Sequence, residues 1–173
     1  MSSEESSESS EPGRLAGPLD KTDRAIIAEL LKDGRISIRA LAEQIHISRA
    51  NAYTRIGRMV ADETITGFTA RLNPTRVGLG TSAYVTVTIQ QNAWRAVSES
   101  LRKVPYIEHF ALVGGDYDVL ALVRTPDNTA LREVVLEQIQ SIPNVRSTRT
   151  WLVFEEAQGH GADWDDQDAP GRS

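Results

Sequence analysis

Residues 36–57 read Ile-Ser-Ile-Arg-Ala-Leu-Ala-Glu-Gln-Ile-His-Ile-Ser-Arg-Ala-Asn-Ala-Tyr-Thr-Arg-Ile-Gly and predict two short helices joined by a tight turn. Ser37 and Ser48 are expected to cap them, because a serine hydroxyl accepts a hydrogen bond from the backbone of the first helical turn. A second helix can cross the first only where small and apolar residues occupy fixed offsets. Those offsets hold Leu41, Ala42, Ile45, Ile47 and Ala52. The stretch therefore predicts a helix-turn-helix.

The polar residues that remain near the start of the second helix point outward together, and they predict a surface that reads DNA. They are Ser48, Arg49, Asn51, Tyr53 and Thr54. Asn51 has the chemistry to pair with adenine and Arg49 with guanine. Ser48 can contact a phosphate with the exposed edge of its hydroxyl while it caps its own helix. The alternative interpretation is a solvated polar helix face.

Arg55 and Arg58 lie later on the same helix, and two interpretations of them stay open. They can contact DNA phosphates, as arginines at this distance from the helix start often do. They can instead pair with Asp62 or Glu43. Between Arg35 and Arg58 the sequence holds five arginines against the single acidic residue Glu43, so the local charge favours phosphate contact.

The overall charge of −5 over 173 residues hides this basic region, because the acidic residues gather at the two ends. Residues 1–17 hold four acidic residues and one arginine, and residues 155–173 hold six and one. Both segments are predicted to be disordered acidic tails, since neither has apolar periodicity. The 17 basic and 14 acidic residues between them suit a partner such as double-stranded DNA.

Several classes of protein are excluded by composition. The sequence has no run of 18 apolar residues, so no membrane span is predicted. The N-terminus lacks the basic and apolar regions of a secretory signal. Without cysteine there are no disulfides or thiolate metal sites, and three scattered histidines predict no metal site and no cofactor. We therefore expect a cytoplasmic protein without contact to a membrane.

The second half of the chain has a different rhythm. Alternating residues 83–90 predict a strand, a helix begins at Asn92 and stops at Pro105, and strands follow at 107–113 and 117–123. A helix after Asp127 ends at Pro143, and residues 145–154 form the last strand. The order is that of the ferredoxin-like βαββαβ fold. The chain is therefore predicted to be α+β.

Domain boundaries follow from these patterns. Asp20 and Asp23 predict a capping box at the start of a first helix, and the alternating residues 65–72 predict an extended strand that leaves the helices. We expect a winged-type helix-turn-helix domain with a linker strand over residues 18–73. A ferredoxin-like domain for oligomerisation and effector binding is expected over residues 74–154.

Strand 107–113 bears on assembly, because both of its faces are largely apolar. Ile107, Ala111 and Val113 are expected on one face, and Phe110 and Leu112 on the other. Two helices cover only one face of a four-stranded sheet, so a second copy of the chain is the simplest cover for the other. A two-fold homodimer also suits a protein with one DNA-reading helix per subunit.

Motifs in both halves resemble the Lrp/AsnC, or feast/famine, family of regulators from about Leu19 to Phe154. The matching residues are Leu19-Asp20-x-x-Asp23-x-x-Ile26-Ile27, Gly34-Arg35-x-Ser37, Leu41-Ala42, Ile47-Ser48, Arg55-Ile56, Ile65-x-Gly67-Phe68, Gly115-x-Tyr117-Asp118 and Thr150-x-x-Val153. No single motif is specific, but their order and spacing across two domains are. The chain departs from the family at His46, where glycine is usual in the turn, so this L-residue must tolerate a strained backbone. It also departs at Glu63, where glycine usually follows the recognition helix, so that helix is expected to end differently.

The resemblance implies a sequence-specific DNA-binding transcription regulator. Members of the family that resemble this chain form dimers, which are often assembled into octamers, and an amino acid or related metabolite changes that assembly. By likeness, the effector contacts are Gly114, Gly115, Asp116, Tyr117 and Asp118. From the residues alone, these glycines and aspartates favour an ordinary hairpin turn.

Two other functions stay open. Some tetrapyrrole decarboxylases, which are enzymes, resemble the same architecture, and His109 with nearby arginines would then be the candidate groups. The basic outward helix face argues against the enzyme, because an enzyme of this type is free to lose that face. A ligand-binding scaffold without DNA contact is the third interpretation.

Overall fold

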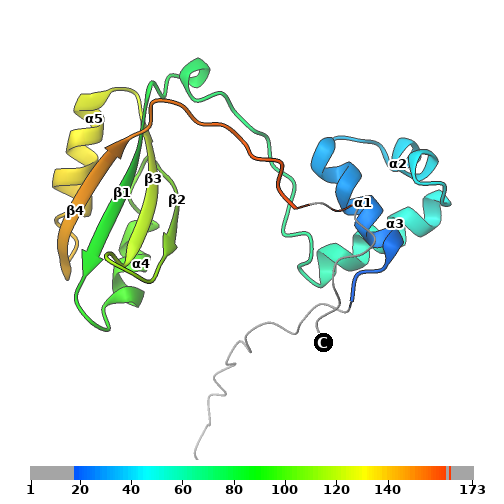
Figure 1. The fold of residues 1–173 in the computed structure, drawn as a ribbon, viewed down its shortest axis with the longest axis horizontal. Coiled ribbons are helices and arrows are strands. Elements are labelled where there is room, and N and C mark those ends of the chain that lie inside the picture. The colour runs from blue at the N-terminus through cyan, green and yellow to red at the C-terminus, as the bar shows by residue number, and fades with distance from the viewer. Residues whose placement is uncertain (1–17, 163, 165–173) are drawn as a thin grey trace, which may run out of the picture. The chain divides into compact units, whose positions relative to one another are not determined.

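The computed structural model describes residues 18–162 and 164, which divide into two compact units (Figure 1). The first unit comprises residues 18–70, 159–162 and 164, and the second comprises residues 71–158. The tail predicted at residues 1–17 lies outside the described residues, and so do residues 163 and 165–173 of the tail predicted at residues 155–173. In the described part, no helix is long and apolar enough to cross a bilayer.

Three helices build the first unit: α1 (Lys21–Lys32), α2 (Ile38–Gln44) and α3 (Arg49–Ala61). The predicted caps are confirmed at all three. Asp20 Oδ1 accepts from Asp23 N at 2.8 Å, with the reciprocal bond of a capping box, and Ser37 and Ser48 accept from Ala40 N and Asn51 N, each at 3.1 Å. Each cap satisfies an amide that the helix itself leaves without an acceptor.

The core of the first unit joins all three helices. Ile26 and Ile27 of α1, Leu41 of α2 and Met59 of α3 form a buried cluster. Trp164 packs half-buried against this cluster, although it lies in the segment 155–173 that was predicted to be disordered. The aromatic ring therefore adds to the apolar packing of the helical unit.

The linker strand predicted over residues 65–72 is wrong, because these residues pair with no strand. Ile65 N donates to Met59 O at 2.8 Å, which closes the turn after α3, and residues 66–73 then run without helix or strand. Apolar alternation predicts an extended backbone, but a strand also needs a neighbour that completes its hydrogen bonds.

The second unit is a four-stranded antiparallel sheet with the order β2-β3-β1-β4, and this confirms the predicted ferredoxin-like α+β fold. A short 3-10 turn, η1 (Thr75–Val77), precedes it. Its strands are β1 (Thr81–Ile89), β2 (Ile107–Leu112), β3 (Val119–Thr125) and β4 (Val145–Leu152). Its helices are α4 (Trp94–Leu101) and α5 (Asn128–Glu133), which continues as the π-helical η2 (Val134–Ile139).

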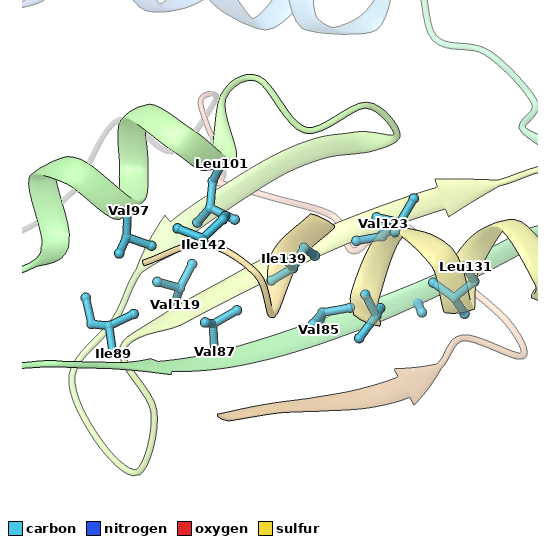
Figure 2. Close-up of a cluster of buried hydrophobic side chains, with 13 residues drawn as sticks. Val85, Val87, Ile89, Val97, Leu101, Val119, Val123, Leu131, Ile139 and Ile142 are labelled. Carbon is cyan, nitrogen blue, oxygen red and sulfur yellow. The ribbon is translucent and has the colours of Figure 1, made fainter. Parts of the chain in front are cut away.

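Both helices of this unit cover the same face of the sheet. Figure 2 shows Val97 and Leu101 of α4 and Ile139 of η2 above the valines of the strands. The opposite face carries Tyr84, Leu122 and Trp151, because these residues oppose one another across β3, β1 and β4 and paired side chains share a face. Trp151 is 61% exposed there.

A bulge in β2 corrects the predicted faces of that strand. Ile107 pairs with Val123 and Phe110 with Ala121, but His109 pairs with Leu122, so the register shifts between Ile107 and His109. Ile107 and Phe110 therefore both pack against the helix-covered core, where simple alternation had placed them on opposite faces.

Candidate functional site

The outward face of α3 is the first candidate site. The five polar residues predicted to read DNA from this face are all exposed: Ser48, Arg49, Asn51, Tyr53 and Thr54. The Tyr53 side chain is 72% exposed. Arg49 makes no ion pair with any residue that the structure describes, so its guanidinium stays available to a partner. Ala52 and Met59 bury the opposite face of the helix.

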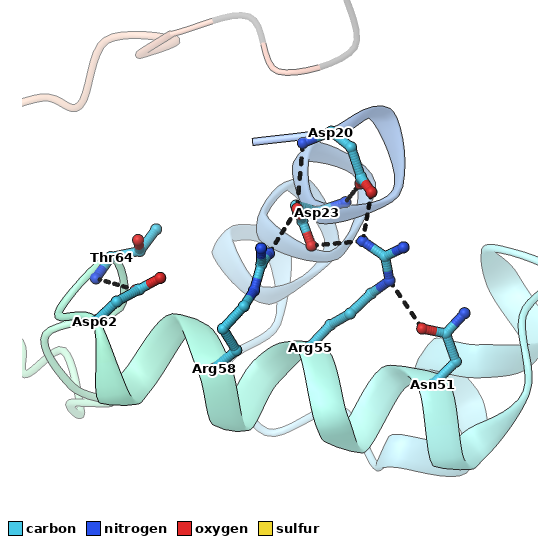
Figure 3. Close-up of polar contacts among 7 residues, drawn as sticks. All are labelled: Asp20, Asp23, Asn51, Arg55, Arg58, Asp62 and Thr64. Carbon is cyan, nitrogen blue, oxygen red and sulfur yellow. Dashed lines mark hydrogen bonds and ion pairs between the residues drawn. The ribbon is translucent and has the colours of Figure 1, made fainter. Parts of the chain in front are cut away.

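A network of carboxylates and guanidiniums joins the later part of α3 to the start of α1 (Figure 3). Asp23 lies at its centre with a side chain only 1% exposed. Arg55 Nη1 donates to Asp23 Oδ1 at 2.8 Å and to Asp20 Oδ2 at 2.7 Å. Arg58 Nη2 lies 2.6 Å from Asp23 Oδ2. Two arginines of α3 are therefore held by one buried carboxylate of α1.

These contacts correct the partners predicted for Arg55 and Arg58. Neither arginine pairs with Asp62 or Glu43; Arg39 Nε takes Glu43 instead, at 2.9 Å, and Asp62 Oδ1 accepts from Thr64 N at 3.1 Å. Arg58 is still 48% exposed, whereas the Arg55 side chain is 25% exposed. Arg55 thus serves the contact between α1 and α3 and is not presented freely to solvent.

The network sets the charge states of its members. Burial raises the pKa of the Asp23 carboxyl, but hydrogen bonds from Arg58 and Arg55 outweigh burial, and the pKa lies below its ordinary value. The backbone bond from Asp23 and the Arg55 guanidinium lower the pKa of Asp20. The two carboxylates in turn raise the pKa of Arg55. All three groups are therefore charged at neutral pH.

The loop between β2 and β3 is the second candidate site. Gly114, Gly115 and Asp116 are exposed, and Tyr117 and Asp118 are half-buried. Asp118 Oδ2 accepts from Ile89 N at 2.8 Å, and Asp118 N donates to Val87 O at 3.0 Å, so Asp118 ties the loop to β1. Gly115 has a φ of 139°, a conformation that favours glycine.

A surface cavity of about 370 Å³ adjoins this loop. Of the five residues predicted for effector contact, Asp118 alone lines it. The rest of the lining is Ile89, Gln90, Gln91, Asn92, Trp94, Leu112 and Val113. Residues 90–92 of the β1–α4 connection had not been singled out from the sequence, because only the sheet brings them beside the loop.

Arg124 is another residue that the sequence did not reveal. It lies on the sheet face away from the helices, is nine-tenths buried, and reaches Ser82 Oγ at 2.9 Å and Glu156 Oε2 at 2.7 Å, with Glu108 as a third partner. Burial lowers its pKa, but the carboxylates of Glu156 and Glu108 outweigh burial and raise it. The Arg124 guanidinium therefore stays charged although the residue is largely buried on this face.

His109 was the candidate group of the enzyme interpretation, and the structure places it exposed on β2. It shares a shallow hollow of about 380 Å³ with Arg102 and Glu108. Within the described residues, no group of three metal-ligating side chains gathers there or elsewhere.

Two family profiles match the chain. One described as a winged helix-turn-helix DNA-binding domain covers residues 19–66, and one described as a Lrp/AsnC ligand binding domain covers residues 82–162. The leucine-responsive regulatory proteins of Escherichia coli strain K12 and Klebsiella pneumoniae are each 34% identical over 143 residues, which are 81% of this chain and 87% of the relative.

Solved structures are similar over most of the chain. The Neisseria meningitidis transcriptional regulator NMB0573, in complex with L-Met, has a TM-score of 0.77 and 26% identity over 82% of this chain and 94% of that chain. The feast or famine regulatory protein Rv3291c of M. tuberculosis, complexed with L-methionine, has a TM-score of 0.76 and 28% identity over 84% and 99%. Escherichia coli AsnC shares the fold, with a TM-score of 0.76 and 21% identity over 84% and 99%.

The relatives, the two profiles and the two-part fold agree in their order along the chain. The helix-turn-helix coincides with the DNA-binding profile, and the sheet unit coincides with the ligand-binding profile. The chain belongs to the Lrp/AsnC family, and it is accordingly a DNA-binding transcription regulator and not an enzyme.

Proposed function

We propose that this regulator recognises a specific DNA sequence with α3 and that an amino acid controls it through its sheet unit. The exposed polar face of α3, with an unpaired Arg49, is the observation that supports the first part. Side chains near the start of a recognition helix reach base edges in the major groove, and exposed arginines further out reach phosphates. The direct contacts that we propose are those of Ser48, Arg49, Asn51, Tyr53 and Thr54, with Arg58 at the backbone.

The test removes the two side chains best suited to base edges. Arg49→Ala combined with Asn51→Ala is expected to abolish discrimination between the operator and random duplex DNA, measured by fluorescence anisotropy at fixed salt. The operator is first selected from a random duplex library with the unmodified protein. Arg35→Ala, an exposed arginine outside α3, is the matched control that keeps the discrimination. Undiminished discrimination by the double variant would refute the proposed reading face.

The amino acid is proposed to bind beside the β2–β3 loop. An α-amino group needs a carboxylate, which Asp116 and Asp118 supply, and the amides of Gly114 and Gly115 suit an α-carboxylate. Asp118 Oδ2 is engaged by Ile89 N, while Oδ1 has no hydrogen-bond partner among the described residues. The L-methionine held by two structural neighbours supports a ligand of this chemistry.

Calorimetric titration with L-methionine and L-leucine tests this site. We expect saturable heat with the unmodified protein and at least a tenfold weaker response from Asp116→Asn, since an amide cannot pair with the ammonium group. Glu99→Gln, a carboxylate of α4 outside the loop, is the control that keeps the affinity. Equal binding by the Asp116 variant would move the site away from this loop.

We further propose that two copies associate through the sheet face that the helices leave open and that the effector acts by changing higher assembly. The face carries Trp151, which is exposed, beside Tyr84, which is half-buried, and Leu122, which is buried. Exposed apolar area of this kind is typical of an interface between subunits. A homodimer presents two copies of α3 to a two-fold symmetric site, and dimers can combine into larger species such as octamers.

A further inference from the structure

Arg55 holds two neighbours with two different parts of its guanidinium. Its Nη1 donates to Asp20 and Asp23 of α1, and its Nε donates to Asn51 Oδ1 at 2.8 Å, one helical turn earlier on α3 (Figure 3). The side chain thus connects a buried carboxylate to an exposed amide. Asn51 is one of the residues proposed above to meet a base edge.

The contact fixes which way the Asn51 amide faces. Arg Nε carries a hydrogen and can only donate, so the group of Asn51 that faces it must be the carbonyl oxygen. The Nδ2 amino group is then turned away from Arg55, on a residue that is exposed. Outside the helix, Asn51 therefore presents two N–H donors and the second lone pair of Oδ1.

We infer that Arg55 is a positioning residue that orients Asn51 for adenine and is not itself a phosphate contact. Adenine offers an N7 acceptor and an N6 donor in the major groove, which match Asn Nδ2 and the remaining lone pair of Oδ1. This inference rests on the proposed function of α3 as the reading helix. It assigns to Arg55 an effect on base preference that requires no direct contact between Arg55 and DNA.

Arg55 is held in this place by charge. Its partner Asp23 is 1% exposed, and moving the guanidinium to a phosphate would leave that buried carboxylate with Arg58 alone. Loss of one of the two guanidinium partners of a buried carboxylate is costly, so DNA gains little by attracting Arg55 away. Arg49, which has no ion pair among the described residues, can meet a phosphate or base without such a loss.

The experiment separates orientation from charge. The probes are the duplex selected from a random library and versions of it in which each A·T pair in turn is replaced by G·C. The affinity for each probe is measured at salt concentrations from about 50 to about 200 mM. Arg55→Lys keeps the charge but replaces the fixed fork of Nε and Nη1, which reach Asn51 and Asp23 separately, by a single nitrogen on a flexible stem. We expect its preference for one A·T pair to fall about tenfold, with the slope of log affinity against log salt unchanged. The double variant with Asn51→Ala should lose no more than Asn51→Ala alone.

Arg58→Ala is the control for a phosphate contact, because Arg58 is the exposed arginine of α3 that is proposed to meet the DNA backbone. Its salt slope is expected to fall by about 0.9, a change that Arg55→Lys must not show. Arg55→Ala that weakens all duplexes equally and lowers the slope by about 0.9 would make Arg55 a phosphate contact and overturn the inference. If the unmodified protein does not discriminate between the selected duplex and its G·C-substituted versions, the proposed function itself is overturned.

A second variant covers the case in which Arg55→Lys fails to fold, which circular dichroism would show. Asn51→Asp keeps an oxygen for Arg55 Nε but replaces the outward amino group by an acceptor. We expect the preferred base at that position to change from adenine to cytosine, whose N4 group donates in the major groove. An unchanged adenine preference in Asn51→Asp would overturn the inference by itself.

Discussion

At the scale of single residues, His46 and Glu63 hold backbone conformations that glycine adopts without strain. Their φ angles are 57° and 59°, in the turns that precede and follow α3. The resemblance to the Lrp/AsnC family had predicted a strained backbone at His46, and the angle confirms it, whereas the left-handed backbone at Glu63 had not been predicted. An L-residue in this region costs about 1–2 kcal/mol relative to its ordinary conformation.

His46→Gly is therefore expected to stabilise the first unit by about 0.5–1 kcal/mol, because the relief of strain exceeds the added entropy of the unfolded chain. Urea unfolding followed by far-UV circular dichroism measures the change. Asn73→Gly, in the linker and without a positive φ, serves as the control that gives no gain. A loss of stability at His46→Gly would mean that the imidazole itself contributes to the turn.

Asp23 predicts how stability depends on pH. Its pKa is lowered in the folded state, so its stabilising effect is complete above its unfolded pKa of about 3.9 and is lost as pH falls through the lower folded value. Asp23→Asn should cost the first unit about 2 kcal/mol at pH 7, because two charge-assisted hydrogen bonds are weakened. Between pH 5 and pH 3, its unfolding free energy should fall less steeply than that of the unmodified protein.

At the scale of elements, α3 contains one residue with a low helix propensity. Gly57 lies in the helix interior and is exposed, and a Cβ built there meets no atom within 4 Å. Gly57→Ala should stabilise α3 by about 1 kcal/mol, measured by thermal unfolding. Gly80→Ala is the opposite case, because its Cβ would lie 3.0 Å from the Pro126 carbonyl oxygen, and it should not stabilise the protein.

The elements also show how far the sequence alone reaches. The serine and aspartate caps were predictable, because each bond spans only three residues. The absence of the linker strand at 65–72 could not be predicted, since alternation indicates an extended backbone but gives no information about a pairing neighbour. The bulge in β2 was equally hidden, because a single extra residue reverses every face that simple alternation assigns.

The candidate sites divide in the same way. The exposed face of α3 follows from helical spacing, and the sequence predicted it fully. The partner of Arg55 could not be predicted, because Asp23 is 32 residues away and only the crossing of α1 and α3 brings them together. The lining of the cavity by residues 90–92 likewise depends on β1 lying beside β3.

At the scale of the whole molecule, the open sheet face predicts the oligomeric state. Trp151→Arg should convert the proposed dimer to a monomer, because it places a charge within the proposed apolar contact, and sedimentation velocity at several concentrations would measure this. Leu136→Arg is the matched control: Leu136 is 48% exposed, but it lies on the helix that covers the other face. A dimer that survives Trp151→Arg would place the interface elsewhere.

The chain passes between the two units twice, after residue 70 and after residue 158. Both passages adjoin the same end of the sheet, where Ala83 pairs with Leu152 and Val153 N donates to Ser82 O at 2.9 Å. The entry to the sheet unit and the exit from it are therefore neighbours on β1 and β4.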